Sequence, residues 1–292
     1  MRSKILRVLN RFRSSIALCC TVAIVLYSSQ VALTTPIITA ESSTLVSSAK
    51  TIDFRKHFQD LQIDGSILIY DANGNRTYQY NPQRNQTAFL PASTFKILNA
   101  LISLETKVIP DELAILTWDG IARQPPEWNR DLNLKEGMKL SAVWFYQVLA
   151  RRVGHEQMQK WVTQVGYGNH QIGDKEDIDN FWLRGKLRIT PQAQIQFLRR
   201  LYNGDLPFSK RSIAIVKDIT IVEQTPDYTI RGKTGFTGFD DGIKPQIGWY
   251  VGYLEKGKNV YFFATNIDIH TQTDLTARKE LTRRCLREIG VL

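Results

Sequence analysis

Ser93 and Lys96 are the two residues whose types and spacing most directly suggest chemistry. They lie three positions apart in the stretch PASTFKILNAL, residues 91–101. If a helix begins near Ser93, both side chains share one helical face. A serine hydroxyl is a weak nucleophile and needs a base within hydrogen-bond reach, which Lys96 would provide. The N–H groups of a helix start would also suit a developing oxyanion. A serine and a lysine at this spacing occur by chance in many proteins. The alternative interpretation is an N-cap serine followed by a solvated lysine.

Two further motifs give this pair a context. Ser141-Ala142-Val143 begins a predicted helix that extends to Val153, and Lys233-Thr234-Gly235 ends a predicted strand that starts at Tyr228. A Ser-x-x-Lys, a second serine and a Lys-Thr-Gly in this order form the set used by penicillin-interacting serine enzymes. Occurrence of all three in order is far less expected by chance than occurrence of any one.

The elements that must position these motifs follow from periodicity and turn signals. Strands are predicted at 66–70, 76–80, 228–233, 247–254 and 260–266, and helices at 93–106, 141–153, 156–165, 191–202 and 273–289. The chain from about Ile109 to Val222 is predicted to be helical, with interruptions at Gly and Pro residues. Strands at both ends with helices between them predict an α+β fold, in which an antiparallel sheet is flanked by terminal helices and carries an inserted helical lobe. A small ligand would bind in a cleft between sheet and lobe.

Bulk properties exclude some classes of function. The chain has 292 residues, of which 43% are hydrophobic, enough for one large domain. Its net charge is +10, but five of the 38 basic residues precede Ala40, which leaves 33 basic against 28 acidic residues and a net charge of +5. No compact basic-aromatic motif accompanies this excess, so nucleic acid is not an expected partner.

The N-terminal segment predicts export. Residues 1–40 combine a basic start, an apolar run from Ile16 to Tyr27 and then small and polar residues, as in a signal peptide. The cleavage site is not fixed, and an uncleaved membrane anchor is the alternative. Residues 41–50 are predicted to be a disordered linker, and 51–292 the catalytic domain. The protein is therefore expected in the periplasm or secreted, with no membrane contact beyond the export segment.

Cysteine and histidine usage predicts neither a disulfide nor a metal. Only Cys285 lies beyond the export segment, in a helical pattern typical of a buried structural thiol. The four histidines are scattered, with no metal-ligand spacing.

Across nearly all of residues 51–292, the sequence resembles the class D, oxacillinase-type serine β-lactamases. The resemblance is carried by the motifs above together with Trp128-Asn129-Arg130-Asp131, Tyr167-Gly168-Asn169, Phe181-Trp182-Leu183-Arg184-Gly185, Ile247-Gly248-Trp249-Tyr250-Val251-Gly252 and Tyr261-Phe262-Phe263-Ala264. The Tyr-Gly-Asn motif separates this class from the class A β-lactamases. In class A the second motif reads Ser-Asp-Asn, whereas in this sequence the second motif reads Ser-Ala-Val.

The resemblance implies an acyl-enzyme mechanism. Ser93 would attack the lactam carbonyl, and Lys96 would be the base, carrying a carbamate formed from carbon dioxide, with no other cofactor. Carbamate formation needs a neutral amine, which burial favours. Val143, Trp182 and Leu183 would supply the apolar walls, and the Trp182 indole N–H could bind the carbamate. Trp182 as an ordinary core aromatic is the alternative.

Further roles follow from the same resemblance. Ser141 would pass a proton to the lactam nitrogen, supported by Lys233; a helix N-cap and a solvated strand-end lysine are the alternatives. Thr234, Gly235 and Phe236 would line the substrate site, with the Ser93 and Phe236 N–H groups as oxyanion hole. Arg278 would bind the substrate carboxylate, unless it is a surface arginine. Tyr167 and Asn169 are expected to shape a loop. The expected partner is a small β-lactam, and a monomer or a homodimer are both open.

Two departures from the family pattern bear on substrate range. Trp144-Phe145 replaces the proline and smaller residue often found there, which predicts a narrowed cleft or a tighter apolar pocket. The segment Phe236–Lys244 is long and glycine-rich and would border the cleft.

Three other functions remain open from sequence. A β-lactam sensor or a penicillin-binding peptidase would be acylated but turn over poorly. The sensor would normally follow several membrane spans and a metalloprotease motif, and the peptidase would not need Tyr-Gly-Asn or the Trp182-Leu183 pair. A non-catalytic peptidoglycan-binding remnant is the third.

Overall fold

A six-stranded antiparallel sheet, in the order β2-β1-β8-β7-β6-β5, is the frame of the computed structural model. The structure describes residues 52–238, 242 and 244–292. The strands are β1 Gly65–Asp71, β2 Arg76–Tyr80, β5 Ile221–Gln224, β6 Thr229–Phe236, β7 Ile247–Lys256 and β8 Asn259–Asp268. In the chain, helices α2 to α8 all lie after β2 and before β5. The predicted α+β fold is therefore confirmed.

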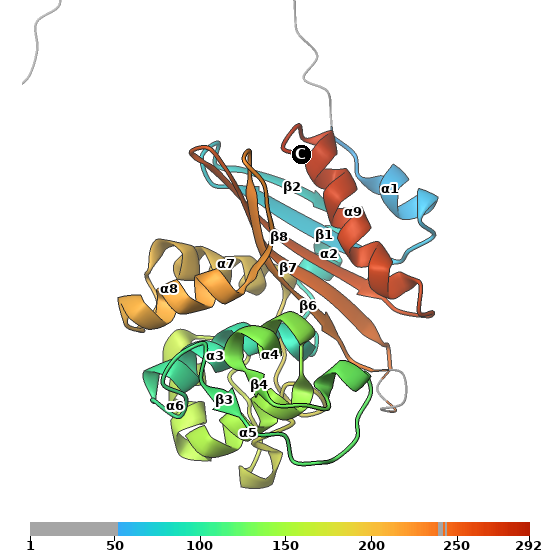
Figure 1. Cartoon of the computed structure of the whole chain (residues 1–292). Coiled ribbons are helices and arrows are strands. Elements are labelled where there is room, and N and C mark those ends of the chain that lie inside the picture. The colour runs from blue at the N-terminus through green and yellow to red at the C-terminus, as the bar shows by residue number, and fades with distance from the viewer. Residues whose placement is uncertain (1–51, 239–241, 243) are drawn as a thin grey trace, which may run out of the picture. The chain divides into compact units, whose positions relative to one another are not determined.

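Helices cover both faces of this sheet (Figure 1). One face is covered by α1 (Arg55–Asp60) and α9 (Asp274–Glu288), and the other by the inserted lobe. The lobe contains α2 Pro82–Asn85, α3 Lys96–Glu105, α4 Leu134–Leu140, α5 Val143–Val153, α6 His155–Val165, α7 Pro191–Asn203 and α8 Lys210–Ile219. A small second sheet pairs β3 (Ile115–Leu116) with β4 (Leu132–Asn133).

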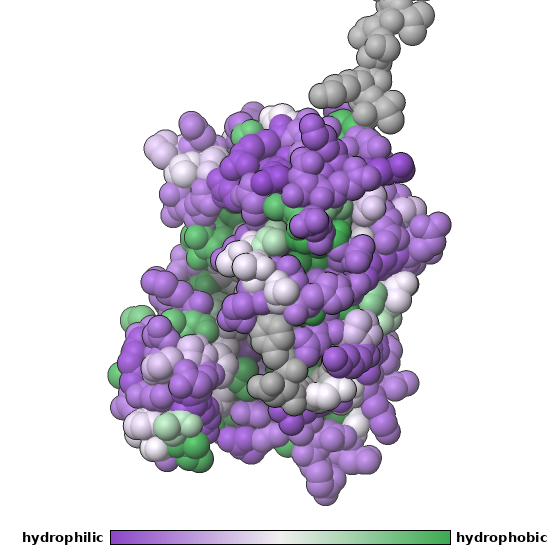
Figure 2. Space-filling model, turned by 90° about the vertical axis from the view of Figure 1, so that its right-hand side faces the viewer, coloured by the Kyte–Doolittle hydropathy of each residue, from purple (hydrophilic) through white to green (hydrophobic). Residues whose placement is uncertain are grey.

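Each layer has its own hydrophobic core, because the central strands are buried on both faces. Ile67, Phe263 and Leu281 belong to the core beneath α9, and Leu98, Phe145 and Trp249 to the larger core under the lobe. The face seen in Figure 2 is mostly hydrophilic with smaller hydrophobic patches, as expected when apolar side chains fill two cores. Cys285 is buried and free, and burial raises the pKa of its thiol, so the predicted structural role agrees with its surroundings.

Lys233-Thr234-Gly235 lies at the end of a strand, as predicted, and β6 continues one residue further to Phe236, which pairs with Gly248 of β7.

Two local predictions were wrong. Ser141 does not begin a helix: it follows α4 with a left-handed backbone (φ 57°), and α5 begins at Val143. The region from Ile109 to Val222 is not helical throughout, because β3, β4 and long loops interrupt it. An Asn133–Glu136 capping box marks the start of α4 and was a readable signal.

The predicted signal peptide and linker lie outside the described residues. Within the part of the chain that the structure describes, no helix is long and apolar enough to cross a membrane.

One buried hydrogen bond ties the segment before Ser93 to the sheet. The Trp249 indole nitrogen on β7 donates to the Leu90 carbonyl at 2.8 Å. We expect Trp249→Phe to lower the free energy of unfolding by about 1–3 kcal/mol, because the carbonyl is left buried without a donor. Trp161→Phe is the matched control: Trp161 is half-buried against Phe208, and its indole donates no hydrogen bond to another described residue. Equal losses in urea unfolding of the two variants would contradict this role for the bond.

Candidate active site

Ser93 and Lys96 meet at the start of α3. Ser93 lies in a 3-10 turn, Ala92–Phe95, that continues directly into the helix. The Lys96 amine is 2.6 Å from the Ser93 hydroxyl oxygen. Ala92 has a left-handed backbone (φ 48°), an uncommon conformation for a residue with a Cβ, and its N–H donates to the Trp182 carbonyl. A backbone hydrogen bond from the Trp182 segment therefore holds the turn that presents the serine.

Lys96 is fully buried, and this burial favours the neutral form of its amine. Loss of hydration lowers the pKa of its amine to about 7. Its nitrogen lies 5.5 Å from the centre of the Tyr146 ring, a neighbour that sequence reasoning missed. Near neutral pH a large share of the amine is therefore neutral and able to accept a proton.

The Trp182 side chain, which stacks on Phe95, the residue before Lys96, holds a buried donor without a partner among the described residues. Trp182 is fully buried, and its indole nitrogen has no hydrogen-bond partner among the described residues. Phe95 stacks on its ring at 5.5 Å between centroids, which fixes the indole in place. Val143 and Leu183 line the nearby cleft. A buried N–H without an acceptor costs stability, so the donor set suits an additional negatively charged group at this point.

Ser141 and Lys233 form a second polar pair. The Lys233 amine, from β6, donates to the Ser141 hydroxyl at 2.9 Å and to the Thr234 carbonyl at 3.0 Å. Lys233 is only 5% exposed, so it is not a solvated strand-end lysine. Its pKa is well below the ordinary value because of burial, and then because of the positive charges of Lys96, Arg278 and Lys279.

The β6 strand approaches Ser93 closely at Gly235. A Cβ at this position would lie 3.0 Å from the Pro91 carbonyl oxygen and 3.2 Å from the Thr94 side chain, so only glycine fits without displacement. The Arg278 guanidinium donates to the Gly235 carbonyl at 2.6 Å. Arg278 is therefore anchored at the site rather than free on the surface, and burial lowers its pKa to about 10.

A cleft of about 650 Å³ connects these groups. Of the predicted residues it is lined by Ser93, Ser141, Val143, Leu183, Thr234, Gly235, Phe236 and Arg278. Lys96 and Trp182 are buried and do not line it, while Lys233 lines an adjoining groove. Sequence reasoning assigned no role to four further lining residues, Gln124, Pro125, Trp128 and Arg184, although the resemblance included Trp128 and Arg184.

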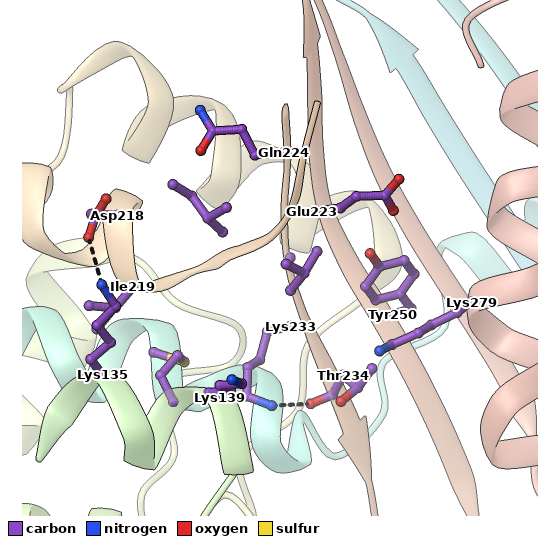
Figure 3. A pocket seen from close by; sticks show the side chains of 14 residues that line it. Lys135, Lys139, Asp218, Ile219, Glu223, Gln224, Lys233, Thr234, Tyr250 and Lys279 are labelled. Atoms are coloured by element: carbon purple, nitrogen blue, oxygen red, sulfur yellow. Dashed lines mark hydrogen bonds and ion pairs between the residues drawn. The ribbon is translucent and has the colours of Figure 1, made fainter. Parts of the chain in front are cut away.

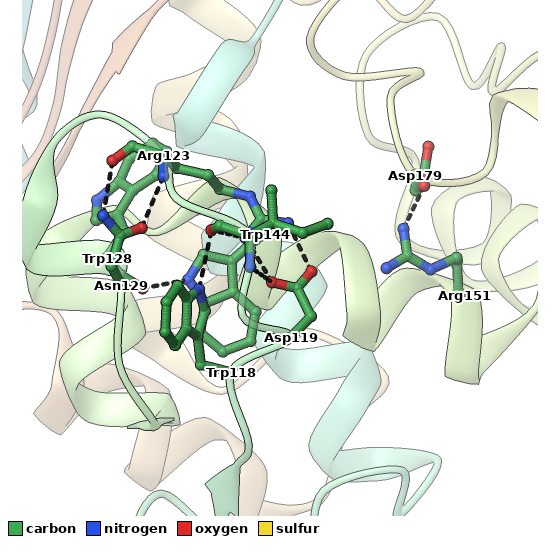
Figure 4. A network of polar contacts seen from close by, with 9 residues as sticks. Trp118, Asp119, Arg123, Trp128, Asn129, Trp144, Arg151 and Asp179 are labelled. Carbon is green, nitrogen blue, oxygen red and sulfur yellow. Dashed lines mark hydrogen bonds and ion pairs between the residues drawn. The ribbon is translucent and has the colours of Figure 1, made fainter.

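Trp144 and Phe145 do not line the cleft, so of the two predicted effects a narrowed cleft is not found. Both are buried in the lobe core, and the Trp144 indole donates to the Trp128 carbonyl at 2.8 Å (Figure 4). The Trp128 indole in turn donates to the Leu140 carbonyl at 3.1 Å. Trp144 therefore supports a cleft wall from behind instead of narrowing the cleft.

Hydrogen bonds and an ion pair hold the segment 119–129, which contributes Gln124, Pro125 and Trp128 to the same cleft wall (Figure 4). The Asn129 side chain accepts from the Arg123 N–H at 2.8 Å and donates to the Arg123 carbonyl at 2.9 Å. The Arg123 guanidinium binds both carboxylate oxygens of Asp119 at 2.7 and 2.6 Å.

The Tyr167-Gly168-Asn169 segment shapes a loop, as expected. Tyr167 is buried edge-on against Phe95. Asn169 accepts from the Arg188 N–H at 2.9 Å and donates to the Lys186 carbonyl at 2.9 Å.

Of the segment Phe236–Lys244, residues 239–241 and 243 lie outside the described residues. Within the described ranges, no group of three His, Cys, Asp or Glu side chains is placed to hold a metal ion.

The burial of Lys96 predicts a pH dependence of stability. Because the folded state lowers this pKa from 10.5 to about 7, the unfolded chain binds more protons between those values, and this contribution to stability rises with pH across the window. In buffer stripped of carbon dioxide, we expect Lys96→Met to be more stable than the wild type near neutral pH, by a few kcal/mol. The difference should shrink as pH approaches 10.5. Lys160→Met, an exposed site on α6, is the control; a pH-independent difference for Lys96→Met would count against a buried neutral amine.

Comparisons with known proteins agree with this geometry. Residues 64–287 match the family described as penicillin binding protein transpeptidase domain. The chain is 40% identical to β-lactamase OXA-5 of Pseudomonas aeruginosa over 84% of its own length and 91% of that protein. It is 42% identical to β-lactamase OXA-48 of Klebsiella pneumoniae over 81% and 87% of the two chains. The crystal structure of a class D β-lactamase, YbXI, from Nostoc superposes with a TM-score of 0.81 at 55% identity, covering 83% of this chain and 100% of that one. The chain therefore belongs to the class D serine β-lactamases.

Proposed function

We propose that this protein hydrolyses β-lactams through an acyl-enzyme on Ser93. The observation that carries the proposal is the 2.6 Å contact between the Ser93 hydroxyl and the fully buried Lys96 amine. A neutral base at hydrogen-bond distance is what a serine needs to attack a carbonyl carbon. The Ser93 proton leaves toward Lys96 as the oxygen–carbon bond forms. The N–H groups of Ser93 and Phe236 would hold the oxyanion.

Opening of the ring needs a proton at the lactam nitrogen. Ser141 lines the cleft and accepts a hydrogen bond from Lys233, so it would donate its proton to the departing nitrogen and recover one from Lys233. The positive charge of Arg278, held beside Gly235, would attract the substrate carboxylate together with the Thr234 hydroxyl.

We further propose that Lys96 works in its N-carboxylated form. Two features of the chain support this: an amine whose pKa is lowered to about 7 by burial, and an indole N–H of Trp182 that lacks an acceptor. Carbon dioxide bound to the neutral amine, with loss of one proton, would give a carboxylate able to take the Ser93 proton. It would pass this proton on toward the Lys233–Ser141 pair, which protonates the lactam nitrogen. The carboxylate would then take a proton from the attacking water and return it to the Ser93 oxygen as the acyl group leaves. Trp182 would hold it by a hydrogen bond, and Val143 and Leu183 would keep the pocket apolar.

A sensor or penicillin-binding role remains the second candidate, since such proteins are also acylated on serine. Both candidates require Ser93, and they differ in the fate of the acyl group. The predicted export segment would place either activity outside the cytoplasm.

Turnover and adduct mass together separate the two. We expect the purified protein to hydrolyse nitrocefin over many cycles, and Ser93→Ala and Lys96→Ala to keep the fold but lose a thousandfold or more of the rate, by the usual scale for nucleophile and base removal, about 10³ or above. Circular dichroism checks the fold, and intact-mass spectrometry follows the adduct. A stable one-to-one adduct without turnover would favour a sensor or a penicillin-binding protein.

The carboxylated base predicts a bicarbonate effect that depends on pH. Below a Lys96 pKa of about 7 the amine is protonated and carbamate is lost, so added bicarbonate should restore nitrocefin hydrolysis at mildly acidic pH. Trp182→Phe should need roughly tenfold more bicarbonate for the same recovery, because one hydrogen bond to a charged group is lost. Trp161→Phe should behave like the wild type. No bicarbonate effect at any pH would exclude this form of the base.

A further inference from the structure

A second groove adjoins the catalytic cleft on the far side of Lys233. Its volume is about 620 Å³, and its walls come from α4, the α8–β5 segment, β6 and α9 (Figure 3). Thr234 lines both the groove and the cleft, so the two are continuous along β6. The proposed function assigns no role to this groove.

The groove has an excess of positive charge. Four lysines line it, Lys135, Lys139, Lys233 and Lys279, against two carboxylates, Asp218 and Glu223.

Both carboxylates already have cationic partners. Glu223 accepts from Arg283 at 2.6 Å, and Asp218 lies 3.9 Å from Lys135. Within the described residues, neither Lys139 nor Lys279 forms an ion pair with a carboxylate, and both are exposed. The Glu136 carboxylate, which binds Arg130 at 2.8 Å, offsets the charge of Lys139 only in part. An anion in the groove would therefore meet two ammonium groups that lack an ion-pair partner.

The groove also has an apolar floor. Met138 and Ile219 are buried beneath it, and Val222 is 49% exposed. Such walls suit a ligand with an apolar or aromatic body and a charged end.

The position of Lys233 determines which part of a substrate reaches the groove. In the proposed mechanism Ser141 and Lys233 face the lactam nitrogen, and Lys233 itself lines the groove. The groove therefore continues from the nitrogen side of the scissile bond, away from the acyl chain. Burial lowers the pKa of Lys233, and the nearby positive charges of Arg278 and Lys279 lower it further. An anion bound in the groove would offset these charges and favour the protonated form that supplies Ser141.

We propose that this groove binds an anionic, partly aromatic substituent on the ring fused to the lactam nitrogen, and that Lys139 and Lys279 set this preference. The inference rests on the proposed function, since it extends the same substrate site. It predicts selectivity among β-lactams by the charge of this substituent rather than by the acyl chain.

Two cephalosporins provide a matched probe. Cefamandole and cefonicid share the mandelamido acyl chain and a tetrazolylthiomethyl group, which is neutral in cefamandole and bears an anionic sulfomethyl group in cefonicid. We expect kcat/KM to favour cefonicid, and K139Q and K279Q each to reduce that preference roughly two- to fivefold, as for a partly exposed ion pair. Added salt should reduce it as well, because exposed charges are screened.

The control is K160Q, which removes an exposed lysine from α6, outside the groove. Both lysine side chains are exposed, so the single variants are expected to fold. A wild type without preference for cefonicid, a preference that is unchanged in K139Q and in K279Q, or one that shifts equally in K160Q overturns the inference. Absence of nitrocefin turnover by the wild type contradicts the proposed function instead.

Discussion

The burial of the Lys96 amine against the Ser93 hydroxyl is the interaction on which the rest of the site depends. An ammonium group is costly to bury, so burial lowers the pKa of this lysine to about 7 and makes a neutral amine available as a base near neutral pH. The turn of α3 provides the short contact, while Phe95 and Trp182 stack beside it. The Trp182 indole has no acceptor among the described residues. The proposed carbamate on Lys96 would use the neutral amine and would also give this indole an acceptor.

The fold supplies the other groups by bringing distant segments to one strand. Insertion of the helical lobe between β2 and β5 places Ser141 against β6, where Lys233 reaches it. On the opposite side of the sheet, α9 brings Arg278 to the Gly235 carbonyl. Several cations therefore converge where a negatively charged substrate would sit. Their summed positive potential is the physical reason why an anionic ligand would be attracted to this region and to the groove beside it.

The sequence was sufficient for the α+β architecture, since strand and helix periodicities are strong where one face is buried. The motif order identified Ser93, Lys96 and Ser141, and the structure places Ser93 and Ser141 on one cleft with the buried Lys96 amine against Ser93. Sequence reasoning failed at Ser141, because its left-handed backbone depends on how α4 and α5 pack against each other. The sequence also left two effects of Trp144 open, because its position depends on contacts with the distant Trp128 segment.

The most direct test of the central claim is ¹³C NMR of the protein equilibrated with ¹³C-bicarbonate near neutral pH. We predict one protein-bound carbamate resonance in the wild type and in Ser93→Ala, which is lost in Lys96→Ala and lost on acidification as the amine becomes protonated. Absence of this resonance from a wild-type sample that hydrolyses β-lactams, or its persistence in Lys96→Ala, would contradict an N-carboxylated Lys96 as the base.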